Sequence, residues 1–474
     1  MDLDKDLAAR QEARLLCRQA EQAQKCLADM NQEQLDLIVE AVAKAFSAAA
    51  VELAELAAAE TGFGNAEDKT TKNRFASETV AEAIRGMKCV GVLNEDPREK
   101  LWQIGVPVGV IAAIVPSTNP TSTVCYKALI ALKSGNSIVF SPHPKAVNCT
   151  LRAAKIVAAA AEKAGAPAGS VGCLSLASMA GCQELMGAKE VKLILATGGP
   201  AMVKAAYSSG KPAIGVGAGN GPAYIHHSAD VKQAVACILK SKTFDYGTVC
   251  ASEQSIIVEK NMEEKVKDEA KRQGFYFMST GEAGLLAKLL FKPNGTLNPD
   301  IVGRPAEKLA QMAGFPVPRG TKILVAREQE AGPTRPYSME KLCPVLAFFV
   351  MDSEDAILQK AVEVLTHEGA GHTFAMHAED RNVIAKFAKA IPVSRFLVNT
   401  PAALGGIGAT TGLFPALTLG CGAVGGSSSS NNISPMDLIN IRRVAWGKEA
   451  RTPQVKVDND LVELLASKIL ERLK

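Results

Sequence analysis

The sequence has few aromatic residues and no long apolar run. Aromatic side chains make up 5% of the 474 residues, whereas 47% are hydrophobic and 22% are charged, a composition typical of a soluble globular protein. No stretch approaches the roughly 18 consecutive apolar residues of a membrane-spanning helix, so we expect no membrane association. The charged first residues, 1–6, lack an apolar signal-peptide core, so we expect a cytoplasmic protein without a secretory leader.

Strong charge imbalance and metal-binding cysteine patterns are also missing. The net charge is +4, and no Lys/Arg cluster is interleaved with aromatics, so a nucleic-acid surface is not expected. The 11 cysteines include no CxxC pair, which argues against a disulfide framework or a zinc site. His367, His372 and His377 are spaced so that each step turns by about 140° around a helix, so we expect no metal site.

Strand and helix patterns alternate through the middle of the chain. Two helical segments, 8–60 and 66–88, come first. Strands are then expected within 101–115, 137–140, 171–176, 191–195 and 213–216, with helices at 121–134, 145–164, 180–188 and 200–209. This alternation predicts right-handed crossovers and parallel sheets, that is, an α/β fold. The chain length indicates two or three domains, with a second α/β unit running to about residue 420.

Cys250 lies just after a Gly-containing turn and just before an apolar strand pattern, within the segment 244–254. A thiol at such a break can expose its sulfur while its own backbone N–H stays free. An acyl-transfer nucleophile needs both features. We therefore predict that Cys250 is a nucleophile, and we expect the other cysteines to be small buried hydrophobes.

Three loops could carry further chemistry. Thr197, Gly198 and Gly199 end a strand and open a helix, where a pyrophosphate can bind, although an ordinary turn has the same pattern. Asn119 follows another buried strand and could donate to an oxyanion, but Asn-Pro is also a common turn pair. The glycine-rich segment 215–221 precedes a strand instead of a helix, so it is not a dinucleotide-binding fingerprint.

Residues 196–220 and 242–254 resemble the CoA-acylating aldehyde dehydrogenases. The likeness is to the aldehyde dehydrogenase half of bifunctional aldehyde-alcohol dehydrogenases and to stand-alone acetylating acetaldehyde dehydrogenases, and it covers about residues 10–448. It implies an aldehyde dehydrogenase-like fold with two Rossmann-type α/β domains and a small oligomerisation element. The implied division is a nicotinamide cofactor domain at 1–225 with oligomerisation strands near 101–110, a catalytic domain at 226–432, an oligomerisation strand at 433–450, and a linker with a terminal amphipathic helix at 451–474.

The resemblance also assigns roles to individual residues. Cys250 matches the catalytic thiol, and Asn119 matches the amide that holds the oxyanion. Glu340 matches a glutamate that orients the nicotinamide ribose. His372 is a candidate for helping to deprotonate CoA, and no metal is expected. The cofactor-binding residues are expected to be Pro116, Ser117, Thr118, Ser141, Pro142, His143, Thr197, Gly198, Gly199, Gly217 and Glu340.

One departure from the wider superfamily predicts the reaction. Hydrolytic aldehyde dehydrogenases carry a water-activating glutamate at the position that aligns with Val216. An apolar side chain cannot act as a general base, so the acyl-enzyme should wait for CoA. The resemblance thus implies reversible oxidation of a small aldehyde to its acyl-CoA with NAD, or with NADP as the alternative. Acetaldehyde is the first expectation, and propionaldehyde and sulfoacetaldehyde are alternatives. A hydrolytic enzyme releasing the free acid is the alternative reaction, and a non-catalytic scaffold is the alternative class.

The C-terminal region suggests partners beyond the small aldehyde and CoA. Residues 438–444 resemble the family's terminal oligomerisation strand, so we expect a homodimer or homotetramer. Residues 460–474 carry an apolar stripe opposite charged residues, which fits a helix docked on its own subunit. It also resembles the encapsulation peptides of bacterial microcompartment enzymes, in which case residues 457–474 would contact a shell or cargo protein and the enzyme would lie inside a microcompartment.

Overall fold

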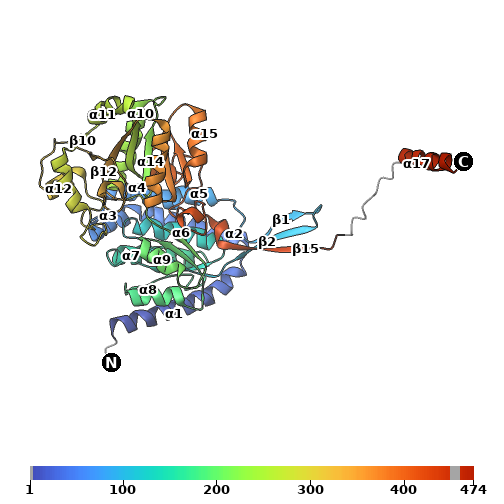
Figure 1. Cartoon of the computed structure of the whole chain (residues 1–474). Helices are drawn as coiled ribbons and strands as arrows, with labels where there is room; N and C mark the ends of the chain where they lie inside the picture. The colour runs from blue at the N-terminus through green and yellow to red at the C-terminus, as the bar shows by residue number, and fades with distance from the viewer. Residues whose placement is uncertain (1–3, 449–458, 474) are drawn as a thin grey trace.

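The computed structural model describes residues 4–448 and 459–473. Figure 1 shows two α/β bodies and a small antiparallel sheet that projects from them. The linker expected at 451–457 lies outside the described residues. Each body is built on a parallel sheet with helices on both faces, as the alternation of strand and helix patterns predicted.

The first sheet has five parallel strands in the order β5-β4-β3-β6-β7. Its strands are β3 (Val110–Ile114), β4 (Ser137–Ser141), β5 (Val171–Cys173), β6 (Val191–Thr197) and β7 (Ala213–Val216). Every residue of β3 is buried, and successive side chains enter different cores. Val110 and Ala112 belong to a core that includes α1 and α8, whereas Ile111 and Ala113 belong to one that includes α2, α6 and α7. Burial on both faces explains why this strand is a continuous apolar run.

The helices around this sheet either precede its first strand in the sequence or connect its strands. They are α1 (Lys5–Ala28), α2 (Gln32–Ala48), α3 (Ala50–Thr61), α4 (Ala66–Arg74), a π-helical turn (Phe75–Thr79), α5 (Val80–Ile84), α6 (Pro120–Lys133), α7 (Val147–Lys163), α8 (Met179–Gly187) and α9 (Pro200–Tyr207). All residues of α6 are buried, so this helix lies at the centre of the body. The long helical segment expected at 8–60 consists of three helices, α1, α2 and α3.

The second sheet has seven parallel strands in the order β10-β11-β12-β9-β8-β13-β14. Its strands are β8 (Gly221–Ile225), β9 (Glu253–Glu259), β10 (Phe275–Phe277), β11 (Ile323–Arg327), β12 (Val345–Met351), β13 (Gly371–His377) and β14 (Val393–Val398). Because β8 pairs with β9 and β13, the chain passes from the first sheet to the second before Gly221. The boundary expected at residue 225 is thus placed too late.

Helices again cover both faces of this sheet. The core on one face includes residues of α12 (Thr280–Leu290), α13 (Ala306–Ala313), α14 (Glu354–His367) and α15 (Arg381–Ala390), and the core on the other includes residues of α10 (Val231–Thr243), α11 (Glu263–Arg272) and α16 (Ala402–Gly406). Along β12, Ala347 faces the first of these cores and Phe348 the second.

A three-stranded antiparallel sheet projects from the two bodies (Figure 1). It consists of β1 (Gly91–Asp96), β2 (Leu101–Pro107) and β15 (Ile439–Ala445), with β2 in the middle. The strands expected at 101–110 and 438–446 therefore pair with one another, whereas β1 was not expected. Trp102 and Trp446 meet edge to face with ring centroids 5.0 Å apart, and both rings remain partly exposed.

The terminal helix α17 (Asn459–Arg472) has the amphipathic pattern expected from the sequence, but every described residue in it is exposed. Leu461, Leu465 and Leu470 are each more than half exposed. The structure therefore gives no support to docking of this helix on its own subunit. Among the described residues, no helix is both long and apolar enough to cross a membrane.

Candidate active site

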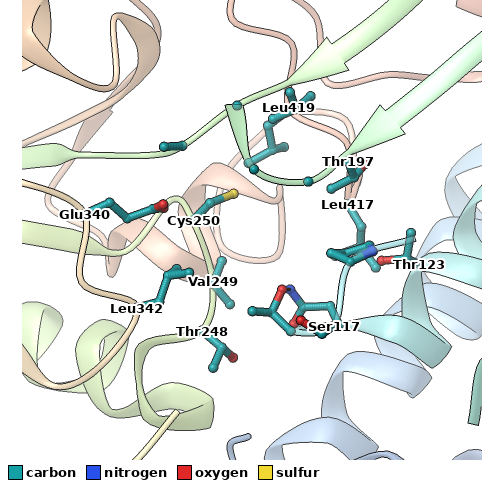
Figure 2. Close-up of a pocket in the computed structure, with 18 of the residues that line it drawn as sticks. Ser117, Thr123, Thr197, Thr248, Val249, Cys250, Glu340, Leu342, Leu417 and Leu419 are labelled. Atoms are coloured by element: carbon teal, nitrogen blue, oxygen red, sulfur yellow. Dashed lines mark hydrogen bonds between the residues drawn. The ribbon is translucent and has the colours of Figure 1, made fainter. Parts of the chain in front are cut away.

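A pocket lies where the strands of the first sheet end and those of the second begin. The loops after β3, β6 and β7 form one wall, and the loop before β9 forms another, which agrees with ligand binding at the carboxyl ends of parallel strands. Figure 2 shows the sulfur of Cys250 directed into this space, with Glu340 on one side and Thr197 on the other. The lining residues are Lys72, Pro116, Ser117, Thr118, Asn119, Thr123, His143, Thr197, Gly198, Gly199, Val216, Gly217, Ala218, Thr248, Val249, Cys250, Glu340, Leu342, Ile407, Leu417 and Leu419.

Cys250 is a protonated thiol in the free protein. Burial, together with the nearby Glu340 and Cys421, raises the pKa of Cys250 to about 12, although Arg395 opposes the rise. A thiolate is the reactive form of cysteine. The nucleophile predicted from the sequence therefore lies in the pocket, but the free protein keeps it mostly unreactive at neutral pH.

The loop before Cys250 has an unusual backbone. Asp245 has φ 47° and Tyr246 has φ 50°, and left-handed conformations of this kind cost about 1–3 kcal/mol each for residues other than glycine. The Asp245 carboxylate accepts hydrogen bonds from Lys69 Nζ at 2.9 Å and Lys72 Nζ at 2.5 Å. It also accepts from Thr248 Oγ1 at 2.7 Å. These contacts hold the strained loop, and with it the position of the nucleophile.

Glycine is required where the two sheets are connected. A Cβ on Gly219 would lie 1.9 Å from the carbonyl oxygen of Cys250, so no side chain fits there. The Gly219 N–H donates to Glu340 Oε1 at 2.9 Å. The glycine-rich segment that failed the fingerprint test therefore lets the backbone pass directly beside the nucleophile.

Glu340 is held at the pocket wall in a mostly neutral form. Burial raises the pKa of Glu340 to about 8, and the negative charge of Glu368 adds to this effect. The Glu340 N–H donates to Glu368 Oε2 at 2.7 Å. At neutral pH the Glu340 side chain is thus predominantly a carboxylic acid.

The loop at Thr197–Gly199 fits a phosphate-bearing cofactor. Thr197 Oγ1 is buried without a hydrogen-bond partner, and a Cβ on Gly199 would meet nothing within 4 Å. The N-terminus of α9 follows immediately, and free backbone N–H groups at a helix N-terminus attract anions. A bound cofactor would thus supply the partner that Thr197 lacks.

Most of the expected cofactor residues line this pocket, but two do not. Ser141 and Pro142 are buried at the end of β4 and are not among the lining residues, whereas His143 is. The pKa of His143 is lowered by burial of its ring and by the charge of Lys145, and both effects disfavour an imidazolium at the pocket.

The structure does not bring His372 into the pocket. Its side chain is fully buried at the start of β13, and its Nδ1 lies 2.9 Å from Thr373 Oγ1. Burial, with a contribution from Arg395, lowers the pKa of His372 to about 3. Such a weak base, away from the pocket, is unsuited to deprotonating CoA, so the expected role of His372 is not supported.

A separate histidine cluster lies at the far end of the second sheet. Ligand atoms of His226, His227 and Glu259 are within 4.8 Å of one another. However, the Ser228 N–H donates to His226 Nδ1 at 3.2 Å, which places the ring proton on Nε2, where Glu354 Oε1 lies 3.5 Å away. This tautomer offers no lone pair to a metal, so we interpret the cluster as histidine–carboxylate contacts.

Sequence reasoning missed the lysines that reach the site. Lys69 and Lys72 are each 3% exposed, although α4 is polar throughout and reads as a solvent-exposed helix. The sequence itself shows only that the two lysines are three positions apart and therefore lie on one side of the helix. The structure shows that this side, together with Asn73, is buried.

Comparisons with known proteins identify the family. The model described as "Aldehyde dehydrogenase family" matches residues 5–274. The bifunctional aldehyde-alcohol dehydrogenase AdhE of Escherichia coli K12 is 46% identical over 440 residues, which cover 92% of this chain and 49% of the relative. The chain thus spans about half the length of the curated relatives of this kind.

Two crystal structures match over nearly their whole length. A probable aldehyde dehydrogenase from Listeria monocytogenes is 53% identical, with a TM-score of 0.93 and coverage of 94% of this chain and 99% of that one. An acetylating aldehyde dehydrogenase from Geobacillus thermoglucosidasius is 49% identical, with a TM-score of 0.92 and coverage of 94% and 98%. These matches confirm the fold class predicted from the sequence, and they establish that this chain belongs to the aldehyde dehydrogenase family.

Proposed function

We propose that this protein is a CoA-acylating aldehyde dehydrogenase, which oxidises a small aldehyde with NAD+ and CoA to the acyl-CoA, reversibly, through a thioester on Cys250. The observation that carries the proposal is that an apolar residue, Val216, occupies the pocket wall where hydrolytic relatives carry a glutamate. It is 2% exposed and lines the pocket, so the wall offers no base for water at this position. Glu340 is the only carboxyl group among the described lining residues, and it is mostly protonated at neutral pH. A thioester on Cys250 would therefore persist until a thiol arrives.

The chain's own residues can supply the nucleophile and hold the oxyanion. The Cys250 thiolate adds to the aldehyde carbon, and the resulting oxyanion accepts hydrogen bonds from Asn119 Nδ2 and from the backbone N–H of Cys250. Thr197, Gly198 and Gly199 would hold the nicotinamide cofactor, which would supply the hydride acceptor for the oxidation. The thiolate of CoA then attacks the thioester carbon, and Cys250 leaves as a thiolate. One thioester replaces another, so the reaction can run in both directions.

The apolar wall favours a small uncharged aldehyde. Ile407, Leu417 and Leu419 line the pocket with Cys250, and apolar side chains do not stabilise an anionic substrate group. Arg335, which lies five residues before Glu340 in the sequence, pairs with Glu330 at the surface and so does not offer a cation to such a group. Acetaldehyde is thus the first candidate and propionaldehyde the second, whereas sulfoacetaldehyde is less well matched.

The preferred cofactor is NAD rather than NADP. His143 reaches the pocket, while no arginine is found among its described lining residues and the lysine among them, Lys72, is already paired with Asp245. A 2′-phosphate usually needs a cationic partner. Comparing kcat/KM for NAD+ and NADP+ with the same aldehyde tests this preference.

The activity test is NADH formation at 340 nm from acetaldehyde and NAD+, with and without CoA, followed by a panel with propionaldehyde and sulfoacetaldehyde. We expect turnover only with CoA, and none for Cys250→Ala. Equal turnover without CoA, with release of the free acid, would instead identify a hydrolytic aldehyde dehydrogenase.

We further infer that the protein is a homodimer or homotetramer assembled through the three-stranded sheet. Trp102, Ile441, Val444 and Trp446 place partly exposed apolar side chains there, and exposed apolar patches mark interaction surfaces. Light scattering coupled to size exclusion should show an oligomer that Trp446→Glu weakens. An unchanged mass for this variant would remove the proposal.

The exposed apolar stripe of α17 supports a second interaction. We propose that residues 457–474 contact another protein, such as a microcompartment shell or cargo protein, in the cytoplasm of a bacterium. Deleting 457–474 should leave the specific activity unchanged and abolish co-sedimentation with shell assemblies. A loss of activity would favour docking on the enzyme itself.

A further inference from the structure

A buried lysine connects the oxyanion donor to the loop of the nucleophile. Lys72 Nζ donates to Asn119 Oδ1 at 2.6 Å and to Asp245 Oδ2 at 2.5 Å. It also donates to Thr248 Oγ1 at 3.0 Å, so all three of its N–H groups have partners. One ammonium group at the pocket wall thus joins α4, the loop after β3 and the loop before Cys250.

This contact determines which way the Asn119 amide faces. An ammonium group can only donate hydrogen bonds, so the atom nearest Lys72 must be the amide oxygen. The amide nitrogen is then directed away from Lys72, and one of its N–H groups donates to Thr118 Oγ1 at 3.1 Å. The second N–H is left for a ligand. A flipped amide would present its oxygen and repel a developing oxyanion.

We propose that Lys72 is a positioning residue for the reaction, because it holds the amide oxygen of Asn119 and so keeps Nδ2 available to the acyl oxygen of the substrate. The inference rests on the proposed function only in that Asn119 is the oxyanion donor. Lys72 acts through Asn119, because all three of its N–H groups are already taken by protein partners. Charge-assisted hydrogen bonds are stronger than neutral ones, which makes an ammonium group better suited to this task than a hydroxyl.

Lys69 provides a matched control within the same helix. It is as buried as Lys72, with 3% exposure, and it pairs with the same carboxylate at 2.9 Å. Its other contact is the backbone oxygen of Thr118 at 3.0 Å, not the side chain of Asn119. Removing either lysine takes one cation from Asp245, but only the removal of Lys72 releases the amide.

The test is a double-mutant cycle in which we measure the rate at which p-nitrophenyl acetate acylates Cys250. The rate is obtained from the initial burst of p-nitrophenolate. This step needs neither NAD nor CoA. Asn119→Ala should slow the burst by about 10²–10³-fold, as for other oxyanion donors, and Lys72→Met by about 10²-fold. The double variant should be slower than Asn119→Ala by no more than the factor that Lys69→Met costs, because apart from its contacts with the Asp245 loop Lys72 acts through Asn119. Lys69→Met should have a smaller effect, and its effect should multiply with that of Asn119→Ala.

A second readout separates positioning from general damage to the loop. Alkylation of Cys250 by iodoacetamide develops no oxyanion, so Lys72→Met should alkylate no more slowly than Lys69→Met, which also takes one cation from Asp245, and Lys72→Arg should recover much of the lost acylation. If Lys72→Met does not fold, the cycle is measured with Lys72→Arg and Lys72→Gln. An unchanged burst, multiplicative losses in the double variant, or a parallel loss of alkylation would each overturn the proposal. If the cycle gives the expected acylation rates but the enzyme shows no CoA-dependent oxidation, only the proposed function would be rejected.

Discussion

Lys127 donates to the carbonyl oxygen of Leu195 at 2.9 Å, and the same fully buried ammonium also donates to the carbonyl of Ile114 at 2.8 Å. The lysine thereby joins the ends of β3 and β6, whose following loops form one wall of the pocket. No carboxylate is paired with it among the described residues. Burial lowers the pKa of Lys127 from its ordinary value of 10.5 to about 7.

This lowered pKa predicts how stability depends on pH. Between pH 7 and 10 the unfolded chain keeps the Lys127 proton while the native protein loses it, so this residue makes the native state more stable as the pH rises. The melting temperature of the wild type, measured by calorimetry, should therefore increase relative to that of Lys127→Met from pH 7 to 9.5. A difference that stays constant over this range would contradict the assignment.

Introducing a base beside the thioester should change the acceptor. In Val216→Glu, a carboxyl group in an apolar wall would have a raised pKa and could activate water. We expect NADH formation without CoA to rise by about 10²-fold, the lower range for general-base catalysis, with release of the free acid. Val216→Gln has nearly the same size but no basic group, so it should stay dependent on CoA. Equal rates for the two variants would show that the acceptor is selected elsewhere.

The raised pKa of Cys250 predicts its reactivity. Because thiolate is the nucleophile, alkylation by iodoacetamide in the free enzyme should rise about tenfold per pH unit from pH 7 to 10. Peptide mapping by mass spectrometry separates Cys250 from the exposed Cys26. A plateau in the Cys250 rate below pH 9 would mean that its thiol ionises much more easily than its burial indicates.

Glu340 should make the binding of NAD+ dependent on pH. Its carboxyl group loses its proton near pH 8, and the carboxylate would then attract a positively charged nicotinamide and would accept hydrogen bonds from ribose hydroxyls. The affinity for NAD+, measured by calorimetric titration, should increase through this range, and it should be flat for Glu340→Gln. NADH, whose nicotinamide is uncharged, should show a weaker dependence. Identical pH profiles for wild type and Glu340→Gln would exclude this role.

The sequence predicted the features that depend on local patterns. Alternating strands and helices indicated parallel sheets, and Cys250 was recognisable because it lies where a turn meets a strand. Asn119 and Thr197 also fitted ordinary turns, and the family resemblance assigned their roles. All three line the pocket. Val216 also lines it, because β7 ends at that residue.

Features that depend on distant contacts were not predictable. Lys72 reads as a solvent-exposed residue in a polar helix, and only folding brings it to Asn119 and Asp245. His372 shows the opposite error. A histidine between glycine and threonine suggests an accessible base, but packing around β13 buries it. The membership of β8 in the second sheet likewise depends on pairing with β13, which is remote in the sequence.

The strained loop at Asp245 also has a consequence for the order of folding. Its carboxylate is held by groups 173 to 180 residues earlier in the chain, and contacts of such long sequence separation form late and slowly. The nucleophile should therefore acquire its native surroundings only after both sheets have formed and α4 has docked between them. During refolding, helical circular dichroism should return before the burst of acylation does, and catalytic competence would be the last property that the chain regains.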